Sequence, residues 1–135
     1  MTILRLVVMG LVTAFLLSGC KSVQPVYNVV DHPLPDVVSK LSQEKAENIF
    51  IAAASKRGWV FRNTGDGELQ GSLNIRAHSA KVTAKIGPKS FSITYHSSSN
   101  LHATEDRIDK NYNRWIHYLE QDVASALILG ANLID

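Results

Sequence analysis

Apolar and polar residues alternate with a period of two between residues 59 and 98. This is the pattern of β-strands that bury one face and expose the other. It runs through four segments, residues 59–62, 69–77, 80–86 and 90–98. Turn-forming residues, "NTGDG" and "GPK", separate the first pair and the last pair. Because each segment keeps one polar side, the pattern predicts a four-stranded antiparallel sheet that faces water on one side.

The register of these strands can be tested on the sequence, because facing residues of paired strands lie on the same side of a sheet. Pairing Ile75 with Val82 keeps apolar or glycine residues opposite each other. Pairing Val82 with Tyr95, and Phe61 with Leu69, does the same. Since the three pairings agree, the sequence predicts that consecutive segments pair as a meander.

Two further segments repeat apolar residues at helical spacing. The first begins after Ser42, a suitable N-cap, and ends before Gly58, which suits the left-handed position that follows a helix. The second carries its apolar face on Ile108, Tyr112, Trp115, Ile116, Leu119, Val123 and Leu127. The expected order is α-β-β-β-β-α. Both helices must cover the single apolar face, which predicts an α+β fold: a two-layer sandwich with the two helices on one face of the meander.

The N-terminus has the composition of a secretory signal. Arg5 precedes an apolar run that is too short to span a bilayer as a helix, which takes about 20 apolar residues. The run ends in Leu17-Ser18-Gly19-Cys20, which resembles the lipobox of bacterial lipoproteins. The resemblance implies a signal peptide over residues 1–19, cleavage before Cys20, and diacylglycerol and a further fatty acid such as palmitate on that cysteine. The alternative is an ordinary secretory signal with a chance cysteine.

The residues after the cysteine indicate where the domain lies. In the lipoprotein class an aspartate there marks retention in the inner membrane, so Lys21 implies the outer membrane, with the domain on the periplasmic side. Residues 20–35 contain three prolines, which favour extended chain. We expect this segment to be a tether that holds a single domain, residues 36–135, away from the membrane.

Composition and charge exclude several classes of function. Removing residues 1–19 takes away one arginine and no acid, which lowers the formal net charge from +2 to +1. A nucleic-acid-binding domain needs clustered Lys and Arg, so no nucleic-acid partner is expected. The histidines lack the close, fixed spacing of a zinc site, and we expect neither a metal nor a cofactor. No second cysteine exists to form an internal disulfide.

A serine run at residues 97–99 lies close in sequence to His96 and His102. A serine and a histidine could serve as nucleophile and base in a hydrolase. However, no G-x-S-x-G elbow surrounds the serines, and serines after a strand usually form turns. We therefore expect no enzymatic activity, and the hydrolase is the weaker alternative.

One group of side chains on the polar face is a candidate ligand-binding site. In the register above, Arg76, Lys81 and His96 lie side by side across three strands. Such a row could bind an anionic group, for example the phosphate of a lipid or a glycan. A solvated basic surface is the simpler interpretation, since most surface charges bind nothing.

Two other segments could contact an envelope protein. Residues 90–98 should form an edge strand without lysine or proline, open to an added strand unless the loop after it covers the edge. The C-terminal segment "ASALILGANLID" is more apolar than one helix face requires. It either packs on the first helix, the preferred interpretation, or forms a contact patch.

Four sequence pieces follow the lipobox in order: "RGW" at residues 57–59, "HSAKV" at 78–82, "YHSSSNL" at 95–101 and "IDKNYNRW" at 108–115. Together they resemble a family of small proteobacterial lipoproteins. The resemblance implies a shared fold and location over residues 42–120, and no activity. The sequence thus predicts a lipid-anchored, non-catalytic binding or assembly module of the cell envelope. The alternative is a binder of anionic lipid or glycan through the open sheet face.

Overall fold

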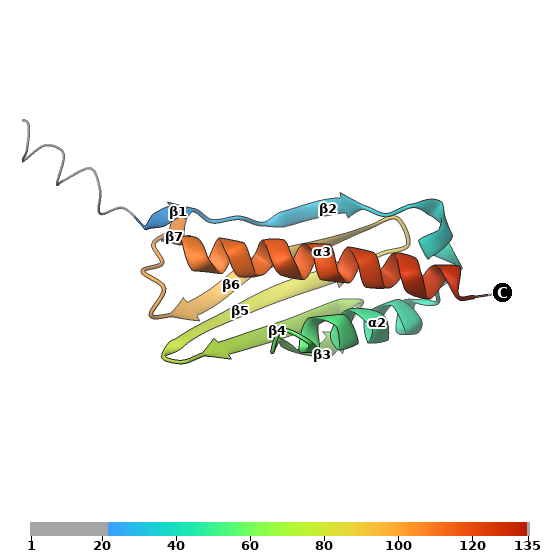
Figure 1. Cartoon of the computed structure of the whole chain (residues 1–135), viewed down its shortest axis with the longest axis horizontal. Helices are drawn as coiled ribbons and strands as arrows, with labels where there is room; N and C mark the ends of the chain where they lie inside the picture. The colour runs from blue at the N-terminus through green and yellow to red at the C-terminus, as the bar shows by residue number, and fades with distance from the viewer. Residues whose placement is uncertain (1–21, 135) are drawn as a thin grey trace, which may run out of the picture.

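A computed structural model describes residues 22–134 of the chain. The signal peptide expected over residues 1–19 and the lipidated Cys20 lie outside the described residues. The described part is a mixed α+β fold with two α-helices, a five-stranded antiparallel sheet and a two-stranded sheet (Figure 1). The predicted α+β class is therefore confirmed.

The large sheet contains one strand more than the sequence indicated. Its order is β2-β6-β5-β4-β3, with bounds β2 Val29–Pro33, β3 Val60–Gly65, β4 Glu68–Ile75, β5 His78–Ile86 and β6 Ser90–Ser99. β3 to β6 follow one another as antiparallel hairpins, and β2 pairs with the outer side of β6. The prediction of four strands is wrong because β2 comes from the proline-containing segment. Pro33 is tolerated there because it ends an edge strand.

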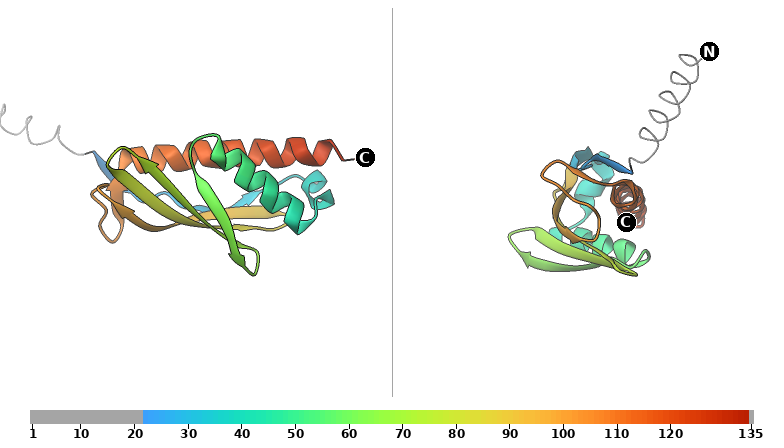
Figure 2. Two further views of the ribbon diagram at one scale, coloured as in Figure 1. Left: turned by 90° about the horizontal axis from the view of Figure 1, so that it is seen from below. Right: turned by 90° about the vertical axis from the view of Figure 1, so that its left-hand side faces the viewer.

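Two α-helices pack on the sheet: α2 (Gln43–Ser55) and α3 (Lys110–Asn132). A short 3-10 helix, η1 (Asp36–Lys40), connects β2 to α2. Seen along the long axis of the molecule, the sheet curves partly around α3 (Figure 2). The other face of the sheet is left without a helix.

Both helices begin at side chains that bind free backbone N–H groups, and Ser42 is the N-cap that the sequence predicts for α2. The Ser42 hydroxyl accepts a hydrogen bond from the N–H of Lys45 at the start of α2, and the Asp109 carboxylate accepts from the N–H of Asn111 at the start of α3. Gly58 follows α2 with a φ of 93°, the left-handed conformation expected after a helix.

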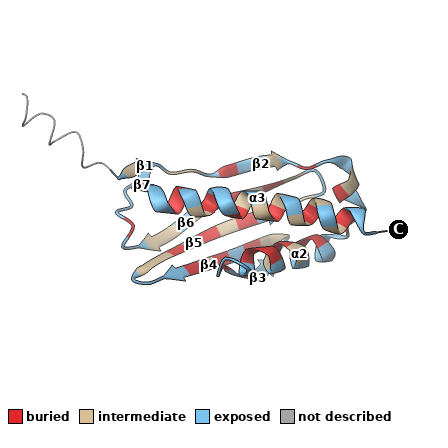
Figure 3. Ribbon diagram, in the orientation of Figure 1, coloured by how far each residue is buried: buried red, intermediate tan, exposed pale blue. Residues whose placement is uncertain are grey.

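The hydrophobic core lies between the helices and the inner face of the sheet. Buried residues alternate along the strands and recur on one side of α3 (Figure 3). The predicted apolar face of the second helix is buried, except that Trp115 is half-buried, and its first residue, Ile108, lies in the strand before α3 and not in the helix. The largest fully buried side chains are Trp59, Tyr112, Phe50, Phe91, Leu69, Ile93, Leu101, Ile108, Ile116, Leu119, Leu127 and Val38.

A second, two-stranded sheet joins the start of the described chain to the start of α3. β1 (Val23–Pro25) pairs with β7 (Arg107–Asp109), and the Lys110 N–H donates to the Ser22 carbonyl at 2.9 Å. The expectation of a tether over residues 20–35 is therefore wrong from residue 22 onward. The prolines do favour extended chain, but this extended chain pairs with strands of the domain.

The strand register agrees with prediction in one hairpin and differs in the next. Val82 pairs with Tyr95, as predicted. Ile75 pairs with His78 instead of Val82, a difference of four residues. A two-residue turn makes this possible, because Arg76 adopts a φ of 56° in it. An even displacement leaves every side chain on its expected face, so the facing test could not detect it.

The hairpin of β3 and β4 is displaced in the same way. Phe61 pairs with Gly71 rather than with Leu69. The ring of Phe61 therefore covers the glycine on the inner face of the sheet.

β6 is not an edge strand over most of its length, which corrects the prediction for residues 90–98. The neighbouring β2 pairs with it at Ser90, Phe91 and Ile93, and the Asn28 side chain accepts a hydrogen bond from the Tyr95 N–H. The edges of the five-stranded sheet are β2 and β3.

Candidate functional site

The face of the sheet that carries no helix is hollowed over its central strands. The hollow has a volume of about 430 Å³. It is lined by Val60, Arg62, Thr64, Gln70, Gly71, Ser72, Lys81, Val82 and His96. The lining thus combines polar side chains with three basic groups, those of Arg62, Lys81 and His96, and includes no carboxylate.

Strand alternation brings Arg62 and Lys81 to this face. Arg62 stands opposite Gln70 on β4, and Lys81 stands opposite Ser72 on the other side of the same strand. The two cations are therefore two strands apart and displaced by two residues along the sheet. From the usual strand spacing their Cα atoms are about 12 Å apart. Both side chains are long enough to reach one small ligand between them.

A β-bulge directs His96 into the same hollow. Lys81 pairs with Ser97, but the next residue, Val82, pairs with Tyr95, so His96 is an extra residue on β6. Bulges of this kind change the direction of a side chain and strengthen the local twist. His96 is exposed and lines the hollow.

The structure brings together two of the three residues predicted as a ligand-binding row. Arg76 does not belong to the site, because the four-residue difference in register places it in the β4–β5 turn at the end of the sheet. Arg62 takes its place, and sequence reasoning missed it. The signal was present in the alternation, which puts Arg62 on the polar face, but it could be used only with the correct register.

The charges of the hollow are not compensated. Among residues 22–134 neither Arg62 nor Lys81 makes an ion pair. The acid on this face of β4, Glu68, stands opposite Lys85 in the β4–β5 register. A guanidinium can bind two oxygens of an anion at once, and an ammonium adds a point charge. The arrangement is therefore suited to a ligand with a phosphate or carboxylate group.

The serine run at residues 97–99 is not arranged as a nucleophile. The Ser98 hydroxyl lies 2.8 Å from the Tyr95 hydroxyl, and the Nδ1 atom of His78 lies 2.7 Å from the Asn100 carbonyl oxygen. In the described part of the chain no serine hydroxyl is hydrogen-bonded to a histidine, and no three His, Cys, Asp or Glu side chains gather as metal ligands. No helix between residues 22 and 134 is long and apolar enough to cross a membrane.

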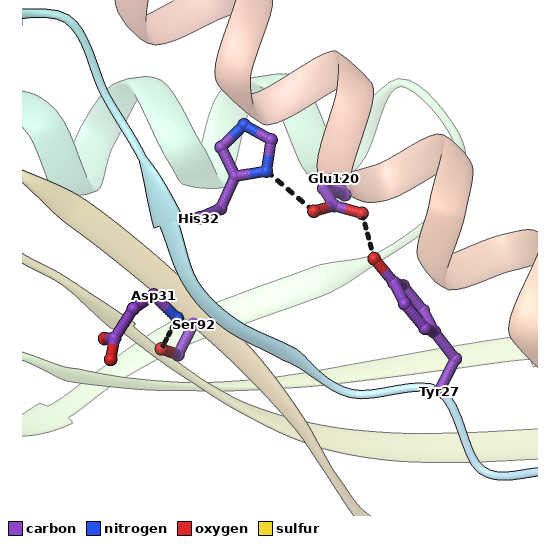
Figure 4. A network of polar contacts seen from close by, with 5 residues as sticks. All are labelled: Tyr27, Asp31, His32, Ser92 and Glu120. Atoms are coloured by element: carbon purple, nitrogen blue, oxygen red, sulfur yellow. Dashed lines mark hydrogen bonds and ion pairs between the residues drawn. The ribbon is translucent and has the colours of Figure 1, made fainter.

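On the helical side, Glu120 fastens the N-terminal segment to α3 (Figure 4). Its carboxylate accepts a hydrogen bond from the Tyr27 hydroxyl at 2.6 Å and lies 2.7 Å from Nδ1 of His32. The Tyr27 ring stacks on His117 at 3.9 Å, and the His32 ring stacks on Phe91 at 4.7 Å. The hydrogen bond to Glu120, followed by burial and the carboxylate charge, raises the pKa of Tyr27 to about 12.

Asn113 is a second fastening of the same segment. This buried amide accepts a hydrogen bond from the Tyr27 N–H and donates one to the Pro25 carbonyl, each at 2.9 Å. On the far side of β2 the Asp31 N–H donates to the Ser92 hydroxyl (Figure 4). Sequence reasoning missed these contacts, because a segment expected to be a tether has no predicted neighbours.

Tyr112 places a hydroxyl in the core without a partner. The side chain is fully buried, and its oxygen has no hydrogen bond within residues 22–134. Its ring meets Tyr95 edge-on at 5.5 Å. Burial, with a smaller contribution from Tyr95, raises the pKa of Tyr112 above its ordinary value.

The C-terminal apolar segment has two kinds of residue. Leu127 and Ala131 are buried on the inner side of α3. Of the four apolar residues beyond that face, Ile128 is half-buried, but Leu129, Leu133 and Ile134 are exposed, so the preferred interpretation of packing is wrong for three of the four. Leu129 and Leu133 are 63% and 75% exposed. Beside Leu129, a hollow of about 500 Å³ lies between α2 and α3, lined by Ala53, Lys56, Arg57, Asp122, Ser125, Ala126 and Leu129.

Comparison with known proteins identifies no relative of this chain. No protein-family model, no curated protein and no solved structure matches it.

Proposed function

We propose that this chain is a lipid-anchored, non-catalytic binding module of the bacterial cell envelope that binds an anionic group on the open face of its sheet. The anchor is the acylated Cys20, in the outer membrane, with the domain on the periplasmic side. The cation, the short apolar run and the small residues before Cys20 support this anchor. Each buried methylene of an acyl chain contributes about 0.8 kcal/mol, so several chains on one cysteine give a stable attachment.

The positive charge of the hollow on the sheet is the observation that supports an anionic ligand. Arg62, Lys81 and His96 converge there, with no carboxylate in the lining and no ion pair to either cation in the described residues. A volume of about 430 Å³ is in the range of small-molecule sites and suits one phosphorylated headgroup or sugar.

Titration calorimetry with glycerol 1-phosphate and glucose 1-phosphate tests this proposal. A hydrogen bond to a charged group contributes about 1.5–3 kcal/mol, so Arg62→Ala and Lys81→Ala should each weaken binding by roughly 10- to 100-fold. Arg76→Ala and Lys85→Ala remove the same charges outside the hollow and are the matched controls. We expect these controls to bind within about twofold of the parent, because surface charges outside a site contribute little. Equal losses in all four variants, or unchanged binding in the first two, would refute the site.

Assembly with an envelope protein is the second candidate function, and the exposure of Leu129 and Leu133 favours it. The sequence predicts two possible contact surfaces, the strand at residues 90–98 and the C-terminal apolar segment. Because β2 covers most of β6, the C-terminal end of α3 is the better of these two. Crosslinking of the acylated protein in envelopes, with Cys20→Ser as the control, should recover one or a few partners in constant ratio. Leu129→Ser with Leu133→Ser should abolish that recovery, and recovery that survives this change argues against the surface.

A further inference from the structure

We propose that one end of the domain lies directly on the phospholipid headgroups of the membrane that holds Cys20. This end, called the anchor end below, is formed by β1, β7, the β4–β5 turn, the loop before β7 and the first turn of α3. The inference rests on the proposed acylation of Cys20. It replaces the expectation that a tether holds the domain away from the membrane.

The length of chain between the anchor and the domain is the first argument. The Ser22 carbonyl already accepts a hydrogen bond from the Lys110 N–H, and Val23 pairs with Asp109. Only one residue, Lys21, separates Ser22 from Cys20. Two residues of extended chain span at most about 7 Å. The acylated cysteine therefore cannot lie further than this from the place where the chain joins α3.

Several loops share the anchor end and are joined to it by hydrogen bonds. The Asn100 side chain donates a hydrogen bond to the Ala77 carbonyl at 3.3 Å, which joins the loop before β7 to the β4–β5 turn. The Asp109 N–H donates to the Leu101 carbonyl at 2.9 Å, which joins that loop to the start of α3. Figure 1 shows these turns together at the end where β1 begins. A bilayer at Cys20 thus meets a connected surface and not a single strand.

Charge at the anchor end is the second argument. Arg107 donates a hydrogen bond from Nη2 to the Val23 carbonyl at 3.1 Å, so its guanidinium lies beside the point where the chain leaves the domain. Lys110 and Arg114 are exposed on one side of α3 and make no ion pair within residues 22–134. Near an anionic membrane each such cation favours contact by about 1 kcal/mol, which is roughly a fivefold change in the ratio of contacting to non-contacting protein.

Three acids lie on the same end of the domain. The Asp109 carboxylate is occupied by the Asn111 N–H at the start of α3. Glu105 and Asp106 are exposed in the loop before β7, and Asp106 contacts the Thr104 hydroxyl. They reduce the net charge of this end. The favourable contacts are therefore those of the cations beside Ser22 and Val23, together with Lys21.

This orientation decides what the rest of the molecule can reach. α3 has 23 residues, so its C-terminus lies about 35 Å from its N-terminus. With the anchor end on the headgroups, Leu129 and Leu133 stand at the opposite end of the domain, away from the bilayer. The anionic-ligand hollow on the sheet then opens to the side, parallel to the membrane surface.

Fluorescence quenching in vesicles tests the orientation. Acylation blocks the only native cysteine, so Asn111→Cys and Leu133→Cys each provide a single thiol for a fluorescent label at an exposed position. The full acylated protein is placed in vesicles of phosphatidylethanolamine and phosphatidylglycerol that contain headgroup-nitroxide lipid. We expect several-fold stronger quenching at residue 111 than at residue 133. A flotation assay on the same samples reports whether the protein is anchored at all.

The outcomes separate the anchor from the orientation. Flotation with equal quenching at both positions, or with none at either, would keep the lipid anchor and overturn the orientation. Failure to float would overturn the proposed anchor and the orientation with it. In a further arm, Lys110→Gln with Arg114→Gln should lower the ratio of contacting to non-contacting protein by roughly 30-fold, whereas Lys40→Gln with Lys89→Gln at the other end should not change it. If quenching at residue 111 stays stronger than at residue 133 by the same factor after Lys110→Gln with Arg114→Gln, the role of these cations is refuted.

Discussion

Gly71→Ala should destabilise the domain, because the place of the new methyl group is already occupied. A Cβ atom at this position would lie 2.6 Å from Cε2 of Phe61 and closer still to two other atoms of the same ring. The ring cannot move aside freely, since it packs edge-on against Phe50 at 5.0 Å and against Trp59 at 5.9 Å. The strand pairing of Phe61 with Gly71 holds both backbones in place.

The expected cost follows from overpacking. One extra methyl in a well-packed core costs about 1–3 kcal/mol. Alanine is otherwise favoured over glycine in a strand by about 0.5–1 kcal/mol, which leaves a net loss of about 0–2.5 kcal/mol. Because three atoms of the Phe61 ring occupy the place of the methyl group, we expect a value above the lower end of this range, about 1–2 kcal/mol. With a urea m-value of about 2 kcal/mol/M, the unfolding midpoint should fall by roughly 0.5–1 M.

Urea unfolding of four chains, followed by tryptophan fluorescence, measures this effect: the parent, Gly71→Ala, Phe61→Leu and the double variant. In the Phe61→Leu chain the clash is absent, so adding Gly71→Ala should be neutral or slightly stabilising. Gly87→Ala is the control, because its Cβ would meet only the Ser90 carbonyl oxygen at 3.7 Å. Equal costs of Gly71→Ala with and without the Phe61 ring would refute the reasoning.

Three further predictions concern polar groups. Tyr112→Phe should raise the free energy of unfolding by about 1 kcal/mol, since it removes a buried hydroxyl without a partner, and a lower urea midpoint would contradict this. The hydrogen bond to Glu120 raises the pKa of Tyr27 to about 12. The contribution of this pair to the free energy of unfolding is therefore intact below about pH 10, the ordinary pKa of tyrosine, and is lost as pH rises toward 12. In pH-dependent unfolding, Glu120→Gln should make this loss of stability shallower. Asn113→Ala should speed hydrogen exchange of the Tyr27 amide at least tenfold while α2 amides keep their rates, and unchanged exchange would show that Asn113 does not hold this segment.

Local patterns determined the elements and their faces. The alternation from Trp59 to Tyr95 predicts four strands and correctly separates inner from outer residues, because a strand's period of two is a property of the backbone. After the bulge at His96 the alternation is reversed, and Ser98 pairs with the buried Ala80. The caps at Ser42 and Gly58 predict the ends of α2 for a similar reason, since they satisfy or redirect the adjacent backbone. Alternation and caps depend only on residues close together in the chain, so they can be recognised without knowing the tertiary structure.

The candidate site was predicted in part. Lys81 and His96 line the hollow, and Arg76 does not, because a two-residue turn of residues 76–77 displaced the register by four. Each register that differs by an even number satisfies the same pattern of faces. The choice between them depends on the turn, and here it depends on a non-glycine residue with a φ of 56°, which composition does not indicate.

The sequence by itself determined the α+β class, the two helices, the four consecutive strands and the lipobox-like start of the chain. Only the tertiary structure decided that residues 22–33 belong to the domain. Their prolines and mixed polarity have no periodic pattern, and they are held by partners such as Asn113 and Glu120 that lie more than eighty residues away. Long-range hydrogen bonds of this kind leave no local signal, because both partners are ordinary polar residues until the fold brings them together. The fold thereby also decided how near the domain lies to Cys20, since a segment that pairs with β6 and β7 cannot act as a tether.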